Sequence, residues 1–140
     1  MKTVHLMLFV NVILLSAIGG CGGPKVVPVK GIAMYQGKPV ANVILHFSSS
    51  DGRTSTGMTD EIGHFELQFD RQVKGAAIGT YKVTVAFAPK DPQEEARMAS
   101  GNMQLDPVRA AIVSKFGDRE TTPLTVTITK AETSLEIRLD

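Results

Sequence analysis

The sequence has little of several features that would point directly to a function. It has one cysteine in 140 residues and no tryptophan. No disulfide can therefore form within the chain, and the fold must rest on its own hydrophobic core. Neither sign of charge is in excess, because 15 basic residues face 14 acidic ones. This balance argues against binding to nucleic acid, which requires a basic surface, and against electrostatic docking on anionic lipid.

Long hydrophobic runs are also lacking. The longest, residues 6–18, is interrupted only by Asn11 and Ser16. It is shorter than the roughly 20 apolar residues of a membrane-spanning helix, but it has the length of the apolar region of a signal peptide. Lys2 precedes it, and Ile18-Gly19-Gly20-Cys21 follows it. This junction resembles the lipobox of bacterial lipoproteins, in which small residues precede a cysteine that becomes acylated.

Residues 1–20 are therefore predicted to be a lipoprotein signal peptide, and residues 21–25 a lipidated cysteine with a short tether. The rival interpretation is an ordinary secretory signal cleaved after Gly20, which would leave Cys21 as a free thiol in an oxidising compartment. Removal of Lys2 leaves 14 basic against 14 acidic residues, so attachment must come from acyl chains. The expected location is the bacterial cell envelope. Gly22 after the cysteine favours the outer membrane, by analogy with enterobacterial sorting.

From Val26 onward, apolar and polar residues alternate with the period of two that is typical of strands with one buried face. Clusters of Gly, Pro, Ser and Asp separate the alternating stretches. Seven strands are expected, near residues 29–35, 43–47, 54–58, 65–69, 81–87, 124–128 and 135–139. Clean alternation indicates antiparallel sheets with one wet and one dry face. The prediction is an all-β domain over residues 26–140, a single seven-stranded antiparallel β-sandwich.

The long connection at residues 89–120 lacks this alternation. A short helix is expected over residues 93–100, with Asp91 as its N-cap, Pro92 at its first position and Gly101 as its stop. Residues 112–116 are apolar but not periodic, and Phe116 is the one aromatic residue expected to be exposed. Two interpretations stay open. The segment either covers an edge or end of the sandwich, or is mobile and orders on a partner through methionines such as Met98 and Met103.

Four motifs within residues 26–88 carry a family resemblance. They are Val29-x-Gly31-x-Ala33-x-Tyr35-x-Gly37-x-Pro39, Val43-x-Leu45-x-Phe47, Thr59-Asp60-Glu61-x-Gly63-x-Phe65-x-Leu67 and Gly79-Thr80-Tyr81-Lys82-Val83-x-Val85. Together they resemble carboxypeptidase regulatory-like domains. The resemblance implies a Greek-key, transthyretin-like sandwich, and members of this group are mostly non-catalytic modules. The motifs are structural, and a fold does not fix a function.

Candidate chemistry is sparse. His46 and His64 lie on the outward parity of their strands and have no metal-ligand spacing. A catalytic triad could draw on one of the serines at 48–50, on either histidine, and on Asp51 or Asp60. No Gly-x-Ser-x-Gly elbow surrounds any of these serines, however. Asp60 and Glu61 lack the spaced oxygens of a calcium loop, and Asp60 is expected to accept backbone N–H groups in its own turn.

The sequence therefore predicts a non-catalytic lipoprotein of the cell envelope that works as a structural or binding module, without a cofactor or metal. Its partners would be the membrane, through Cys21, and an unidentified envelope protein or ligand, but not nucleic acid. The alternative is a small hydrolytic or metal-dependent enzyme of the transthyretin-like fold that uses His46 and His64.

Overall fold

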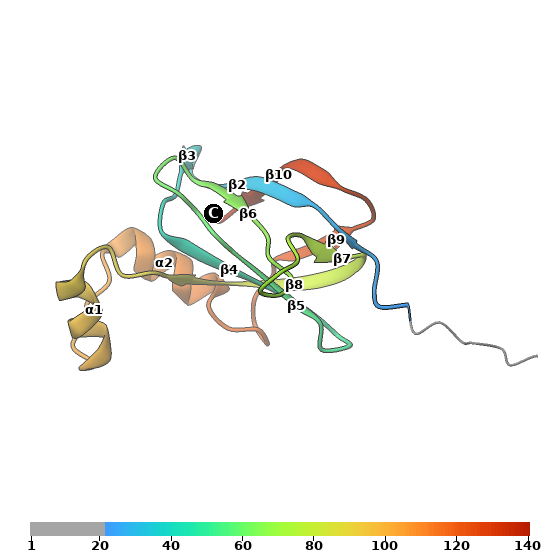
Figure 1. The fold of residues 1–140 in the computed structure, drawn as a ribbon. Helices are drawn as coiled ribbons and strands as arrows, with labels where there is room; N and C mark the ends of the chain where they lie inside the picture. Colours follow the sequence, from blue (N-terminus) through green and yellow to red (C-terminus); the bar gives the residue numbers. More distant parts are fainter. Residues whose placement is uncertain (1–21) are drawn as a thin grey trace, which may run out of the picture.

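The computed structural model describes residues 22–140, so the predicted signal peptide and Cys21 lie outside the described residues. The described part contains ten strands and two helices (Figure 1). The strands are β1 (Val26–Val27), β2 (Val29–Tyr35), β3 (Lys38–Pro39), β4 (Val43–Ser49), β5 (Thr54–Met58), β6 (His64–Glu66), β7 (Ala76–Ala77), β8 (Gly79–Phe87), β9 (Thr125–Ile128) and β10 (Glu132–Arg138). The helices are α1 (Pro92–Ala99) and α2 (Pro107–Phe116). The expected count of seven strands is too low, because β1, β3 and β7 are additional strands of two residues each.

Two four-stranded sheets make up most of the domain. One has the order β5-β4-β8-β9, and all its pairs are antiparallel. The other is built on β2, which pairs with β10 on one side and with β3 and β6 on the other. A small third sheet joins β1 to β7. The domain is thus mostly β-structure, with its sheets packed around one core.

The prediction that all strand pairs are antiparallel is wrong for one pair. Strands β10 and β2 run parallel, with Leu135 opposite Gly31 and Ile137 opposite Ala33. The chain leaves β9 in one sheet and enters β10 in the other. Alternation shows which face of a strand is buried but carries no information about the direction of its neighbour.

The core follows the predicted alternation closely. The fully buried side chains of β4 and β8 include Leu45, Phe47, Tyr81 and Val83, and those of the other sheet include Ala33 and Ile137. Phe65 and Leu67 are buried as predicted, whereas Tyr35 and Phe69 are half-buried. Burial of large apolar side chains contributes roughly 1.5–3 kcal/mol each, so a core of this size can hold the fold without a disulfide.

The long connection contains two helices rather than one. Helix α1 matches the prediction: Asp91 is its N-cap, Pro92 opens it, and none of its residues is buried. Helix α2 was not predicted. It buries Ile112 and Phe116 against the core, and it packs beside β8. The expectation that Phe116 is exposed is therefore wrong, because the helix turns that ring inward.

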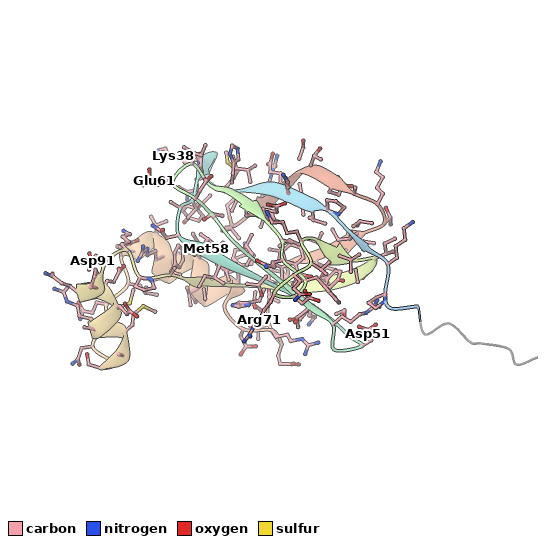
Figure 2. The ribbon with its side chains drawn as sticks, viewed as in Figure 1. Lys38, Asp51, Met58, Glu61, Arg71 and Asp91 are labelled. Carbon is pink, nitrogen blue, oxygen red and sulfur yellow. The ribbon has the colours of Figure 1, made fainter. Side chains whose placement is uncertain are left out.

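The helices and the start of the domain lie at opposite ends. The residues that precede β1 leave the sheets on one side, whereas α1 and α2 stand at the other (Figure 1). Figure 2 shows α1, which follows the labelled Asp91, standing apart from the sheets. At the near end, the amide of Ile78 donates to the carbonyl of Lys25 (3.0 Å), and Val26 pairs with Ala77. The ordered fold thus begins within a few residues of Cys21.

Candidate functional site

The two histidines of the predicted enzymatic alternative do not meet. His46 lies in β4 and His64 in β6, which belong to different sheets. Both are exposed, as their parity predicted. The ring of His46 has the hydroxyl of Thr56 as its neighbour, at 3.4 Å. Within residues 22–140, no group of three or more His, Cys, Asp or Glu side chains is arranged to hold a metal ion.

The serine cluster forms a hairpin end rather than a triad. The hydroxyl of Ser49 donates to the carboxylate of Asp51 and also lies 3.0 Å from the carbonyl of Arg53. The Arg53 guanidinium pairs with the same carboxylate. These two hydrogen bonds, that from Arg53 foremost, hold the pKa of Asp51 well below its usual range. In the part of the chain that the structure describes, neither His46 nor His64 hydrogen-bonds to this group, so Ser49 has no histidine to act as its general base.

Asp60 behaves as its turn predicted. Its Oδ1 accepts the amides of Ile62 (3.0 Å) and His64 (2.9 Å), and Gly63 has a φ of +79°. A carboxylate oxygen committed to two backbone amides stabilises the turn, which accounts for the Asp-x-x-Gly pattern. The predicted lipidation site, Cys21, lies outside the described residues.

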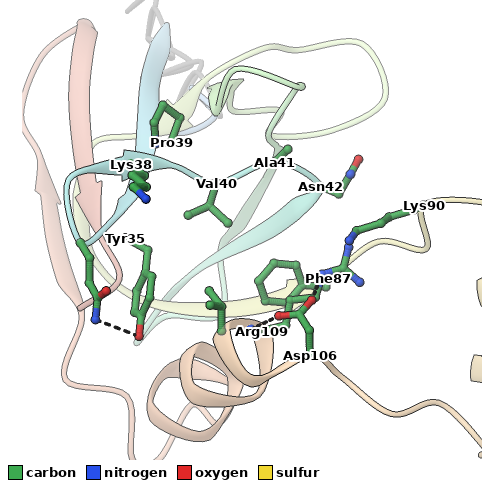
Figure 3. Close-up of a pocket in the computed structure, with 12 residues that line it drawn as sticks. Tyr35, Lys38, Pro39, Val40, Ala41, Asn42, Phe87, Lys90, Asp106 and Arg109 are labelled. Carbon is green, nitrogen blue, oxygen red and sulfur yellow. Dashed lines mark hydrogen bonds and ion pairs between the residues drawn. The ribbon is translucent and has the colours of Figure 1, made fainter.

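A concave site lined by both apolar and charged side chains lies at the end of the domain that carries the helices. It is a cleft of about 400 Å³ between the β2–β3 hairpin, the end of β8 and the start of α2 (Figure 3). This volume lies within the usual range for small-ligand sites. Its lining residues are Tyr35, Gln36, Lys38, Pro39, Val40, Ala41, Asn42, Phe87, Lys90, Asp106, Val108 and Arg109.

Arg109 is the most unusual residue of this cleft. It lies in the first turn of α2, and its side chain is only 6% exposed. Its Nη1 donates to Oε1 of Glu94 in α1 at 2.8 Å, and its Nε is 3.5 Å from Oδ2 of Asp106. Its Cζ lies 4.9 Å from the ring centroid of Phe87, which places the cation over an aromatic face. A buried guanidinium is thus held between two carboxylates and a ring.

Local sequence explains how each wall is placed. Gln36 and Gly37 have φ angles of +47° and +74°, as the two-residue hairpin between β2 and β3 requires. Asn42, with φ of +57°, turns the chain into β4. Asp106 caps α2 by accepting the amide of Arg109 at 2.9 Å. Gln36 and Asn42, the two non-glycine residues with positive φ in residues 22–140, therefore both line this cleft.

A second hollow, of about 440 Å³, is apolar and lies between β8 and the connection of the two helices. Met98, Met103 and Leu105 line it together with Val113 of α2. The predicted methionines of the long connection therefore gather on one surface. Met98 is 41% exposed, and α1 keeps its contact with α2 mainly through Glu94.

The residues of the cleft were not identified from the sequence. One signal for them was present. Asp106-Pro107 repeats the Asp91-Pro92 pattern that correctly predicted α1. The same reasoning applied there predicts α2 and places Arg109 on the side of that helix that carries Ile112 and Phe116.

Among residues 22–140, neither helix is long and apolar enough to cross a bilayer. No protein-family model, no curated protein and no solved structure matches this chain.

Proposed function

We propose that this chain is a non-catalytic lipoprotein of the bacterial cell envelope, anchored by acyl chains on Cys21, with the outer membrane favoured. Its domain is a Greek-key sandwich of the carboxypeptidase regulatory-like, transthyretin-like kind, and it works as a binding module. The Ile18-Gly19-Gly20-Cys21 junction supports the anchor. The family motifs and two sheets around one core support the fold.

The observation that carries the binding role is the position of the cleft. Strand β8 begins at Gly79, beside the short sheet that receives the tether, and ends at Phe87 in the cleft. The four residues between Cys21 and Val26 span only about 14 Å when extended. The helices, beside which the cleft lies, stand at the end of the domain opposite the tether (Figure 1). A domain anchored this closely therefore holds its near end at the membrane and presents the cleft away from it.

The lining of the cleft supports binding rather than catalysis. Among its twelve residues, all within the described part of the chain, there is no serine, cysteine or histidine. Its one carboxylate, from Asp106, is committed to the helix cap and to Arg109. Apolar walls with a few convergent polar groups are typical of ligand sites.

The anchor is tested by Cys21→Ser. The variant is expected in the soluble envelope fraction or as an uncleaved precursor, because it cannot be acylated. Cell fractionation with immunoblotting measures this. A variant that still matures and stays with the membrane would refute the anchor.

The binding role is tested with two matched surface variants of the intact lipidated protein. Val108→Asp places a carboxylate in the cleft, and Val73→Asp places one on the exposed turn before β7, which pairs with β1 at the tether end of the domain; the two side chains are 46% and 39% exposed. Neither change removes core packing, and Asp near the start of α2 suits the helix dipole. Material from envelope extract should co-purify with the wild type and with Val73→Asp but not with Val108→Asp. Identical recovery with all three would refute use of the cleft.

A further inference from the structure

The cleft carries more basic than acidic side chains, although the chain as a whole is nearly neutral. Lys38, Lys90 and Arg109 line it, against the carboxylate of Asp106 and that of Glu94, which pairs with Arg109 from just outside the lining. In the described part of the chain, neither lysine takes part in an ion pair. Two ammonium groups without an anionic partner, beside a buried guanidinium, raise the local concentration of anions.

The guanidinium also has an unused donor. Arg109 uses Nη1 for Glu94, and its Nε lies near Asp106, but its Nη2 is buried and has no hydrogen-bond partner. A buried donor without a partner costs stability, and each such group in a native protein requires an explanation. Because Arg109 belongs to the lining of the cleft, a ligand acceptor in the cleft is the explanation that its surroundings offer.

The remaining walls define what accompanies the negative charge. Tyr35, Val40, Phe87 and Val108 supply aromatic and aliphatic surface (Figure 3). A ligand with a short apolar or aromatic group can bury that group there.

The number of charges on the ligand follows from the neighbours of Arg109. Glu94 and Asp106 already flank the guanidinium. They would repel a phosphate dianion more strongly than a singly charged carboxylate. One carboxylate oxygen is enough to satisfy Nη2, the donor of Arg109 that has no partner.

We propose that this cleft binds a monocarboxylate attached to an aromatic or aliphatic group, with Arg109, Lys90 and Lys38 as its cationic contacts. The inference rests on the proposed use of the cleft as a binding site. The same chemistry is offered by a free organic acid and by the C-terminus of a peptide that ends in an apolar residue.

The test uses the protein with Cys21 and the tether at residues 22–25 left unchanged. It follows the NMR chemical shifts of the backbone amides as each probe is added. The probes are 3-phenylpropanoate, its neutral alcohol 3-phenylpropanol, and phenyl phosphate. The acid should shift amides around Val40, Phe87 and Val108. The alcohol should bind about tenfold more weakly, because it lacks the charged hydrogen bonds. Phenyl phosphate should bind more weakly than the acid.

Acetyl-Ala-Phe with a free C-terminus, compared with its C-terminal amide, distinguishes the two sources. Tighter binding of the free peptide than of 3-phenylpropanoate assigns the site to a peptide C-terminus. The reverse order assigns it to a free organic acid.

Variants provide the control. Lys90→Gln should weaken binding of the acid about three- to tenfold without changing the thermal unfolding midpoint, because an exposed charge contributes little to stability. Lys130→Gln should leave binding unchanged. Lys130 follows β9, whose last residue, Ile128, pairs with Gly79. Gly79 is the first residue of β8, and the cleft lies at the other end of this strand, at Phe87.

Equal affinity for acid and alcohol, or shifts confined to other surfaces, would overturn the inference. If Val108→Asp still abolished co-purification in that case, the cleft would remain a binding site and only its preference for carboxylates would be refuted.

Discussion

The ion pair between Arg109 and Glu94 gives a stability prediction that can be worked from the structure. Glu94→Ala removes the carboxylate that accepts from Nη1 of Arg109 at 2.8 Å. Arg109 cannot easily leave its position, because it sits on α2 between the cap at Asp106 and the buried Ile112. In the variant, the buried guanidinium therefore keeps only one of its two carboxylate neighbours, Asp106.

Breaking a buried ion pair by removing one partner costs about 3–5 kcal/mol. Two features place this case below that range. Glu94 is 20% exposed, so part of its charge is already solvated, and Asp106 remains 3.5 Å from Nε. Helix α1 has no buried residue, so its release would admit water to Arg109. We therefore expect a loss of about 2–3 kcal/mol, at or just below the lower limit of that range.

Urea unfolding followed by circular dichroism measures the loss. With a typical slope of about 1–3 kcal/mol per molar urea, the midpoint should fall by about 1 M or more. The matched control is Lys74→Ala, which removes an exposed pair with Glu66 in which Lys74 is 68% exposed. It should cost less than about 1 kcal/mol. The double variant Glu94→Ala, Arg109→Met should regain stability over Glu94→Ala, because no unpaired charge stays buried.

A Glu94→Ala loss no larger than that of Lys74→Ala would refute this reasoning. It would mean that Arg109 is solvated in the native state, and that its burial cannot be used to argue for a ligand.

Three further predictions concern other parts of the domain. Gly31→Ala should destabilise the domain by about 1–3 kcal/mol or more in urea unfolding, because the new Cβ would lie 2.0 Å from the carbonyl oxygen of Leu135 in the parallel strand β10. An unchanged unfolding midpoint would show that β10 does not lie beside β2 at Gly31. Asp51→Asn should destabilise most near neutral pH. Hydrogen bonds, first from Arg53 and then from Ser49, lower the pKa of Asp51 in the folded state. The ionised carboxylate therefore stabilises the fold above its unfolded-state pKa of about 3.9, and this stabilisation is lost as the pH falls from there through the folded-state pKa. Wild type and variant should therefore converge in acid unfolding curves. Native-state hydrogen exchange should protect α2 as strongly as β8, because α2 is packed on the core, and leave α1 nearly unprotected; equal protection of both helices would contradict the exposed position of α1.

The two sheets could largely be predicted because their information is local. In β4, Val43, Leu45 and Phe47 alternate with Ile44 and His46, and this period alone identifies the buried face. The turns are equally local, since Asp60 and Gly63 encode their own hydrogen bonds and backbone angles. Partners of strands are not local. Nothing within residues 135–139 states that β10 joins β2, or that it runs parallel to it.

The cleft could not be predicted for the same reason. Its walls come from the β2–β3 hairpin, from Phe87 and from the start of α2, segments far apart in the sequence. The partner of Arg109, Glu94, lies 15 residues earlier, on another helix. A charged residue at either position is typical of a solvated helix face. The packing of α2 against β8 buries Arg109, and the Glu94 side chain reaches it from α1.

One part of the site was nevertheless accessible to sequence reasoning. Once Asp106-Pro107 is taken as a helix start, Arg109 stands first in the series Arg109, Ile112, Val113 and Phe116, with the spacing i, i+3, i+4 and i+7 of a buried face. An arginine at the head of such a series must either extend its charge past the apolar face to water or be paired by an acid from elsewhere. Arg109 lies in the first turn of α2, next to the cap, where its side chain has little room to reach water. It is instead paired by an acid from another segment, Glu94. An Asp-Pro cap followed by arginine on the apolar face therefore indicates a buried cation, and with it a second acidic segment that must pack nearby.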